Sequence, residues 1–357
     1  MSTFKPFPKI GSIKDAEYTI SKNNKRKFSH LEISDDGVKT PIFTDSKMPV
    51  LEFSGTVKLH GTNACVIFNS DETIDAQSRT RILSIDADNA GFCSYVTLNT
   101  AQLKLLFSGI LEDYFSLHVF GEWCGENIQS TVALVGIPKT FVIFGILATP
   151  HSGKEIWLPK STFENISNQD INVRNIYEFE TKHVTLDFND LAEGMKLVDQ
   201  YRDDVDAVCP VAKALGSTAD NTFGEGHVWR CTTEGWNVAF KHKGKSHNRK
   251  VNMPKKQTLK TELTDEQLTK LNEFIVNHVT SDRLGQGLES LQERFGDSVE
   301  LNKKHTGDYI KWVIGDIFDE SKADITDLVE HGIDWDKASK LIAMSAKEFY
   351  LEHCDKV

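Results

Sequence analysis

Between residues 49 and 243 the chain repeats short segments in which hydrophobic and polar residues alternate, and this repetition limits the possible folds most. Alternation with a period of two is typical of β-strands that have one buried face. The clearest such segments are 117–122, 140–147, 227–231 and 236–243. Two other segments, 191–201 and 211–215, favour helices instead. This mixture predicts an α+β domain with antiparallel sheets.

The pattern changes after about residue 260, where hydrophobic residues follow a helical period. Thr264 and Gln267 have the spacing of a capping box and predict a helix to about residue 279. A second amphipathic helix is indicated by Ile310, Val313, Ile314, Ile317 and Phe318. Residues 341–351 favour a further helix. The sequence therefore predicts a first domain at 1–244, a basic linker at 245–259 and a small all-helical C-terminal domain at 260–357.

The composition is that of a globular protein, because 39% of the 357 residues are hydrophobic and 26% are charged. No run of about eighteen apolar residues occurs, so we expect no membrane span. The N-terminus lacks the apolar core of a secretory signal. Six cysteines without a C-x-x-C pair favour free thiols over disulfides or a zinc site. These features predict a reduced, cytoplasmic protein.

The negative charge is concentrated in the C-terminal part. The net charge is −11, but residues 261–357 contain 21 Asp/Glu against 11 Lys/Arg, a net of −10. Residues 241–260 contain eight Lys/Arg and no acid. A basic segment of this kind can contact phosphates even when the whole chain is acidic.

Lys58 lies in the sequence K-L-H-G-T-N, between two apolar segments. These segments predict two strands joined at Gly61, because glycine accepts backbone angles that other residues resist. Lys58 would then lie at the end of a strand, in a half-buried position. Lysine is seldom found there without a specific role.

Four further segments place charged residues near strand ends. Arg79 follows a predicted strand, Glu122 ends the strand in F-G-E-W-C-G, and Glu225 lies between two glycines before another strand. Lys241 and Lys243 in F-K-H-K are two positions apart, so their side chains would share one face of a strand, about 7 Å apart. Such a set of lysines, an arginine and glutamates is suited to bind phosphate and a metal ion.

The ordered set K-L-H-G-T-N, S-R, F-G-E, F-V-I-F, G-E-G and F-K-H-K resembles the nucleotidyltransferase motifs of covalent polynucleotide ligases and mRNA capping enzymes. The form K-x-H-G-T-N resembles the nick-sealing RNA ligases of bacteriophages and the kinetoplastid RNA-editing ligases. The motifs extend from Lys58 to Lys243, and the phage group also carries a helical tail.

This resemblance implies an ATP-dependent RNA ligase that joins 3′-hydroxyl and 5′-phosphate ends. The reaction would pass through a covalent lysyl-AMP and an AMP-capped 5′ end. The resemblance further implies RNA repair by nick sealing, with RNA as the partner in a nicked duplex or with bridged ends. It implies a monomer without a membrane partner, in the host cytoplasm if the chain is viral.

The resemblance also implies roles for individual residues. Lys58 would attack the α-phosphate of ATP, and Lys241 and Lys243 would hold that phosphate. Glu225 would bind the divalent metal, Mg²⁺ or Mn²⁺. The other nucleotide contacts would come from Asn63 and Arg79 at the phosphate or ribose, Glu122 at the ribose hydroxyls and Phe144 at the adenine. His60 would assist a later step in which the strand is engaged.

The nucleophile must be an unprotonated amine, whereas free lysine has a pKa of about 10.4. Neighbouring cations and partial burial favour the unprotonated form. We hypothesise that Lys241, Lys243 and a bound Mg²⁺ are the cations concerned.

Alternatives remain open at several of these positions. Lys58 could be a salt-bridged lysine at a strand end, and Glu122 and Glu225 could be ordinary acids in turns. Arg81 competes with Arg79 for the phosphate role, and Phe141 competes with Phe144 for the adenine. Phe144 could instead belong to the core, and His60 could be a structural histidine held by hydrogen bonds.

Two residues depart from the pattern of related RNA ligases. Val57 lies where these proteins often have an acid, and Gly145 lies where they often have Asp. Both departures concern how the edge of the adenine is recognised rather than the phosphoryl chemistry.

Other functions are also compatible with the motifs: a DNA ligase, a capping guanylyltransferase or a non-catalytic RNA-binding relative. The first two typically carry a C-terminal OB barrel, which needs about five strands. The helical tail therefore favours an RNA ligase. The presence of Lys58 argues against a non-catalytic protein, because binding alone needs no nucleophile.

Overall fold

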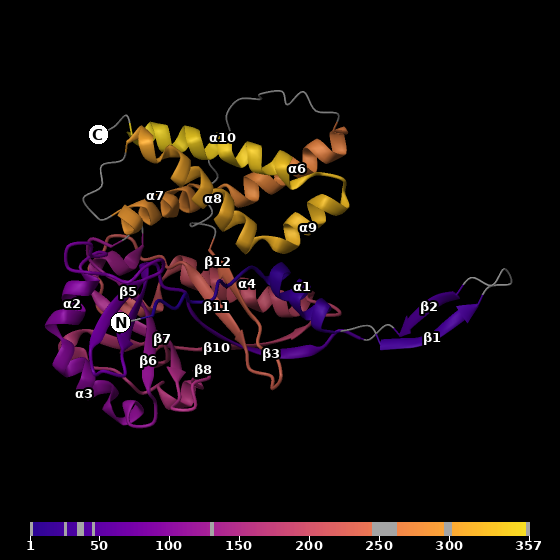
Figure 1. The fold of residues 1–357 in the computed structure, drawn as a ribbon. Coiled ribbons are helices and arrows are strands. Elements are labelled where there is room, and N and C mark those ends of the chain that lie inside the picture. The colour runs from indigo at the N-terminus through magenta and orange to yellow at the C-terminus, as the bar shows by residue number, and fades with distance from the viewer. Residues whose placement is uncertain are drawn as a thin grey trace.

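The computed structural model describes residues 3–24, 27–33, 39–44, 47–128, 132–244, 263–295 and 302–354. Two main sheets and their helices form the larger part of the molecule, and the helices of the C-terminal ranges lie against it (Figure 1). The predicted basic linker at 245–259 lies outside the described residues.

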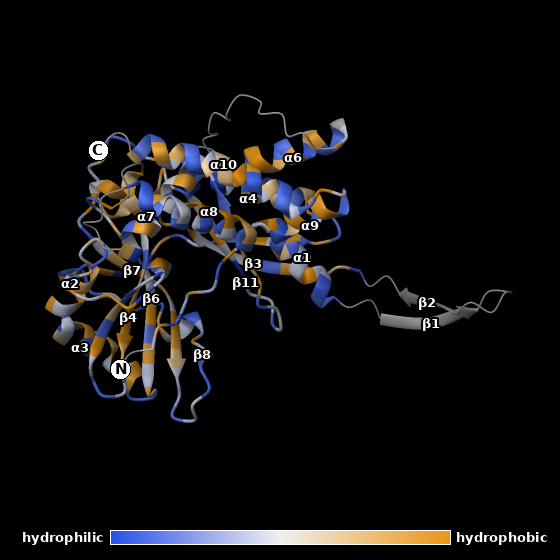
Figure 2. Ribbon diagram, turned by 45° about the horizontal axis from the view of Figure 1, so that its top comes forward, coloured by the Kyte–Doolittle hydropathy of each residue, from blue (hydrophilic) through white to orange (hydrophobic). Residues whose placement is uncertain are grey.

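The larger sheet has six strands. In spatial order they are β5 (Ile74–Ser78), β4 (Thr62–Phe68), β6 (Ser116–Cys124), β7 (Thr140–Thr149) and β8 (Ile156–Trp157), with β9 (Val173–Asn175) beside β7. Neighbouring strands are antiparallel except β9, which runs parallel to β7. Helices α2 (Phe92–Leu98) and α3 (Thr100–Leu111) pack on one face, where Phe92 and Phe107 are fully buried. Figure 2 shows the hydrophobic residues concentrated along these strands.

The smaller sheet has four antiparallel strands. Their order is β10 (Lys182–Asp187), β3 (Val50–Val57), β11 (Gly226–Cys231) and β12 (Ala239–Lys243). Helices α1 (Ile13–Asn23) and α4 (Ala192–Ala207) pack on this sheet around the buried Trp229 and Phe240. Residues 58–61 join β3 to β4, so this short connection crosses from the smaller sheet to the larger one.

The C-terminal helices surround a core of their own. They are α6 (Asp265–His278), α7 (Ser281–Phe295), α8 (Thr306–Glu320), α9 (Lys322–Glu330) and α10 (Trp335–Cys354). Tyr309, Val313 and Ile342 are fully buried among them. Thr264 accepts the Gln267 N–H, and the Gln267 side chain accepts the Thr264 N–H, so the predicted capping box is formed.

The remaining elements are short or peripheral. Strands β1 (Lys27–Ile33) and β2 (Lys39–Thr44) form a two-stranded ribbon that projects from the body (Figure 1). Helix α5 (Pro210–Ala214) follows α4. The 3₁₀ helices are η1 (Ala133–Gly136), η2 (Lys160–Thr162), η3 (Gln169–Ile171), η4 (Ile176–Glu178) and η6 (Lys303–His305).

The predicted fold class is confirmed, with antiparallel sheets in the first part and helices in the second. The strand expected at 236–243 is shorter and begins at Ala239. Gly235 has a φ of 83°, and Cys231 N–H donates to Val238 O, so the preceding residues form the loop between β11 and β12 instead. Helices α1, α2, α3, α7 and α9 and strands β1, β2, β8, β9 and β10 were not predicted.

None of the helices in the described ranges has the length and the apolar character needed to cross a membrane. All six cysteines are free thiols, as the sequence predicted. Cys65, Cys93, Cys124 and Cys209 are buried.

Candidate active site

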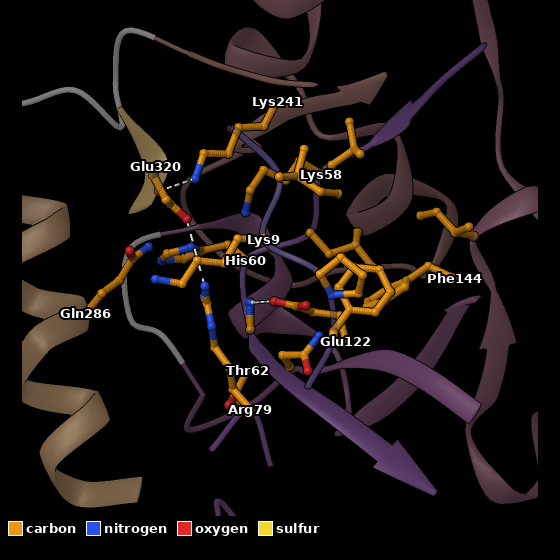
Figure 3. A pocket seen from close by; sticks show the side chains of 18 of the residues that line it. Lys9, Lys58, His60, Thr62, Arg79, Glu122, Phe144, Lys241, Gln286 and Glu320 are labelled. Atoms are coloured by element: carbon orange, nitrogen blue, oxygen red, sulfur yellow. Dashed lines mark hydrogen bonds and ion pairs between the residues drawn. The ribbon is translucent and has the colours of Figure 1, made fainter. Parts of the chain in front are cut away.

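A cavity of about 220 Å³ opens between the two sheets and the C-terminal helices. Its lining includes Lys58, His60, Asn63, Arg79, Glu122, Phe144 and Lys241, which the sequence grouped together, and residues of α7 and α8. Figure 3 shows the labelled side chains, among them Lys58, Glu122 and Lys241, converging from separate elements on one space. Of the predicted site residues, Glu225 and Lys243 do not line the cavity but contact Lys58 or its partner.

Lys58 directly follows β3 and has a half-buried side chain that is 22% exposed, as its sequence position predicted. Its backbone N–H donates to Gly226 O at 2.8 Å, which holds it against the start of β11. The Lys58 Nζ lies 2.6 Å from Glu225 Oε2. The amine is therefore fixed at the cavity by a carboxylate on the adjacent segment.

Gly61 makes the connection to β4 possible, but not for the predicted reason. Its φ lies outside the left-handed region that favours glycine. A Cβ at this position would lie 2.3 Å from Trp123 O and 2.8 Å from Cys124 Cβ. Glycine is required because the backbone of β6 approaches too closely for a side chain.

Glu225 is the buried acid around which the predicted cations gather. Its side chain has no exposed area, and its Oε1 lies 2.9 Å from Lys243 Nζ. His60 Nδ1 lies 3.3 Å from the Oε2 that contacts Lys58. Burial alone would raise the pKa of Glu225, but the charges of Lys243 and Lys58 and the contact with His60 hold it well below its ordinary value. Glu225 is therefore a carboxylate at neutral pH.

Glu122 and Asn63 lie opposite each other on the paired strands β6 and β4. Glu122 Oε1 accepts the Gly61 N–H at 2.9 Å. Burial raises the pKa of Glu122 to about 6, against the opposing charge of Lys58. Asn63 Oδ1 is buried without a hydrogen-bond partner in the described part of the chain. A buried unpaired acceptor at a cavity wall is well suited to receive a ligand donor.

Lys241 and Lys243 lie two positions apart on β12, as predicted, but pair with different acids. Lys241 forms an ion pair with Glu320 of α8, whereas Lys243 pairs with Glu225. Burial lowers the pKa of Lys241 to about 8, although Glu320 opposes this shift. Burial would also lower the pKa of Lys243, but Glu225 outweighs it and the pKa is raised. The charged group beside the Lys58 amine is thus the Glu225 carboxylate.

The two arginines that competed for the phosphate role lie in different surroundings. Arg79 lines the cavity, and its Nη2 is 3.8 Å from Glu320 Oε1. The Arg81 guanidinium donates to the backbone carbonyls of Ala87 and Asp88, so it supports its own loop. Of the two arginines, Arg79 is the one that lines the cavity.

The two phenylalanines differ in the same way. Phe144 lines the cavity and its ring centroid is 4.9 Å from that of Phe7. Phe141 is fully buried in the core of the larger sheet.

The two departures from the pattern of related RNA ligases lie at and near the cavity. Val57 lines the cavity and is only 3% exposed. A Cβ at Gly145 would lie 3.5 Å from the Trp157 ring, which is an ordinary van der Waals distance. Close packing therefore does not require glycine at the position where related ligases often have Asp.

Several lining residues were not identified from the sequence. Glu320 lies between Lys241 and Arg79 (Figure 3). The Glu320 Oε2 is also 2.9 Å from Arg283 Nη2. Arg230 of β11 lines the cavity, and burial lowers its pKa. No local motif marks these residues, because their positions depend on contacts between distant segments.

The comparison with protein families gives one match. The RNA ligase family model matches residues 51–244, more than half of the chain and the region that contains both sheets. The chain belongs to the RNA ligase family. The predicted resemblance is thereby confirmed at the level of the RNA ligase family. The closer likeness to phage and kinetoplastid ligases stays a prediction.

Solved structures of a Naegleria gruberi RNA ligase are similar to this RNA ligase family member. A mutant with AMP and Mn is 18% identical with a TM-score of 0.42, over 68% of this chain and 57% of that chain. The enzyme with PPi is 19% identical with a TM-score of 0.42 over the same shares. A mutant with ATP and Mn is 18% identical with a TM-score of 0.37, over 68% and 63%. The chain thus spans little more than half of these relatives. No curated protein matches it in sequence.

Proposed function

We propose that this chain is an ATP-dependent RNA ligase in which Lys58 carries AMP. The observation that supports this most is the half-buried Lys58 amine at the cavity, 2.6 Å from the buried Glu225 carboxylate. A lysine held only for stability has no need of a cavity lined by a buried polar atom without a partner and by an aromatic ring. Both are present here, in Asn63 Oδ1 and Phe144.

In the first step, the Lys58 nitrogen would attack the α-phosphorus of ATP. A P–N bond forms, the P–O bond to pyrophosphate breaks, and the amine gives up a proton. Lys241 and Arg79 line the cavity and would neutralise charge on the phosphoryl oxygens. Glu122 would accept hydrogen bonds from the ribose hydroxyls, and Phe144 would stack on the adenine.

The AMP would then pass to the 5′-phosphate of an RNA strand, which breaks the P–N bond and forms a P–O–P link. A 3′-hydroxyl oxygen would attack that 5′-phosphorus and expel AMP. Both steps bring phosphates to the same cations, so positioning and charge neutralisation would supply most of the catalysis. His60, which lines the cavity beside Glu225, is our candidate for assisting these later steps.

The proposed reaction uses a divalent cation, Mg²⁺ or Mn²⁺, held together with the phosphates of ATP. Within the described ranges, no group of three or more His, Cys, Asp or Glu side chains could hold a metal by itself. Mg²⁺ is usually held by one or two carboxylates together with substrate phosphates. The ionised Glu225 is the predicted carboxylate, but its two oxygens are paired with Lys58 and Lys243 in this structure. It would hold the cation, whose charge would neutralise phosphate oxygens, once one of these amines has moved to the nucleotide.

The C-terminal helices support RNA rather than DNA ligation or capping. Ranges 263–295 and 302–354 contain helices and no strand that could belong to an OB barrel. We propose that the chain repairs RNA by sealing nicks in a duplex, acts as a monomer and works in the cytoplasm. The domain boundaries at 244 and 260 belong to the same proposal.

A sealing assay tests this function. A nicked RNA duplex with a 3′-hydroxyl and a labelled 5′-phosphate is incubated with ATP and Mg²⁺, beside the same nick in DNA and an unbridged RNA pair. We expect a joined product that forms fastest on the nicked RNA and is absent with Lys58→Arg. Joining of DNA alone, or equal joining by the variant, would contradict the proposal.

A further inference from the structure

Several carboxylates of helices α8 and α9 point toward the first part of the molecule. Asp319 Oδ2 of α8 lies 2.8 Å from Lys9 Nζ, and Asp316 Oδ1 lies 3.8 Å from the same amine. Asp324 Oδ1 of α9 lies 2.6 Å from Lys14 Nζ. Glu320, between them in sequence, reaches Lys241 and Arg79. The carboxylates therefore face the cations of the first part of the molecule.

These cations form a surface that continues from the cavity. Lys9, Arg79 and Lys241 line the cavity itself, whereas Lys14 lies outside it on α1. Lys241 N–H donates to Gly11 O at 2.8 Å, so residues 9–14 run beside the start of β12. We call Lys9, Lys14, Arg79 and Lys241 the cation row.

The side chains of the cation row are better explained as phosphate ligands than as partners of the α8–α9 carboxylates only. Lys14 is 64% exposed and Arg79 is 44% exposed, and exposed ion pairs contribute little to stability. An RNA end must reach the AMP on Lys58 from outside the cavity, and lysine and arginine side chains are the main phosphate contacts in nucleic-acid complexes. The cation row leads from the cavity to the outside.

We propose that the cation row binds the phosphate backbone of the RNA strand, and that the α8–α9 carboxylates occupy these phosphate positions when RNA is absent. This inference rests on the proposed ligase function, because it concerns how the substrate strand reaches the same site. The C-terminal helices and the strand then compete for Lys9, Lys14, Arg79 and Lys241. Residues 261–357 have a net charge of −10. Their carboxylates thus take the place of the RNA phosphates and do not bind the RNA themselves.

Substitutions in the ion pair between Lys14 and Asp324 distinguish this proposal from an alternative. In the alternative, the pair only holds the C-terminal helices against the first part of the molecule. If the pair only braces them, Lys14→Ala and Asp324→Asn both remove that brace and change RNA affinity in the same direction. Asp324→Asn also alters the contact of Asp324 Oδ2 with His278 Nε2, at 3.1 Å within the C-terminal helices. If Lys14 binds phosphate, Lys14→Ala weakens RNA binding, whereas Asp324→Asn strengthens it by releasing the lysine. The matched control is Arg294–Asp308, an exposed pair at 3.1 Å within the C-terminal helices.

The experiment measures the Kd of each full-length variant for a nicked RNA duplex over a range of salt concentrations. We expect Lys14→Ala to weaken binding at least about threefold at low salt and to reduce the salt slope by about one. Asp324→Asn should bind more tightly than wild type, and Arg294→Ala and Asp308→Asn should match wild type.

Weaker binding by both Lys14→Ala and Asp324→Asn, or unchanged binding by both, would overturn the proposal. Thermal unfolding of each variant confirms that it is folded, and Lys14→Arg, which keeps the charge, should retain most of the affinity. Because binding needs no catalysis, the result is independent of whether wild type forms lysyl-AMP. A failure of the ligase function is thus distinguishable from a failure of this inference.

Discussion

The Lys58 amine and the Glu225 carboxylate lie 2.6 Å apart although 167 positions separate them in the chain. The pairing of β3 with β11 brings them together, because His227 is the register partner of Val57. Lys243 approaches the other oxygen of the same carboxylate from β12. One buried acid thus holds two lysines that the motifs assign to phosphoryl transfer.

Glu225→Gln should destabilise the protein and abolish ligation. The substitution leaves Lys58 and Lys243 beside a neutral amide, and loss of one partner of a buried ion pair typically costs about 3 kcal/mol or more. Urea unfolding measures the change in free energy. Glu180→Gln is the control, because Glu180 is 63% exposed in its pair with Lys182 and should change the stability by less than about 1 kcal/mol. Equal effects of the two substitutions would contradict the role given to burial.

Asn63→Ala should weaken nucleotide binding with little effect on the free protein. Its Oδ1 is buried without a partner in the described ranges, so its removal loses no hydrogen bond there. With ATP bound, the loss of one hydrogen bond should cost about 1 kcal/mol, a roughly fivefold increase in Kd. Calorimetry on a Lys58→Ala background measures the Kd without turnover. Asn69→Ala, near the far end of β4, is the control and should leave the Kd unchanged.

Phe144→Ala and Phe141→Ala should have opposite profiles. Phe141 is fully buried, so its truncation should lower the free energy of unfolding by about 3–5 kcal/mol. Phe144 lines the cavity, so its truncation should weaken ATP binding and cost less stability. Unfolding curves and ATP titrations on both variants check this contrast. A larger loss of ATP affinity in folded Phe141→Ala would reverse the assignment of the adenine contact.

Glu122→Gln should change how stability depends on pH. Burial raises the pKa of Glu122 to about 6 from 4.5, despite the opposing charge of Lys58. Between these values the folded protein retains a proton that the unfolded chain has released, so this contribution to stability falls as pH rises through the window. The difference in unfolding free energy between wild type and variant should therefore vary from pH 4.5 to 6 and be constant above about 7. The control is Glu126→Gln, which changes an exposed acid just beyond the same strand.

The sequence predicted the part of the fold that depends on local patterns. The alternation at 140–147 and the capping box at Thr264 both correspond to observed elements. Helices α2 and α3 were missed. Helix α3 is apolar on most sides, and its Leu105 is exposed although Leu103 is buried, while Leu98 at the end of α2 is exposed as well. Tertiary packing, rather than a clear helical stripe, stabilises this segment.

The candidate site was predicted to the extent that its residues lie in ordered motifs. Lys58, Asn63 and Glu122 line one cavity as expected. Glu320 could not be identified, because its pairing with Lys241 depends on how the C-terminal helices lie against β12. The same holds for Lys9 and Asp319, which are 310 positions apart. Contacts between distant segments leave no periodic signal in the sequence.

The most direct test of the central claim is the mass of the intact protein after incubation with ATP and Mg²⁺, with peptide mapping of any adduct. Protein treated first with pyrophosphate, which removes AMP already bound, is compared as wild type, Lys58→Arg and Lys58→Ala. Arginine keeps a positive charge beside Glu225 but cannot act as the nucleophile. We expect one AMP on wild type, located at Lys58, and none on either variant. An adduct on a variant, or no adduct on folded wild type with ATP, would contradict that claim.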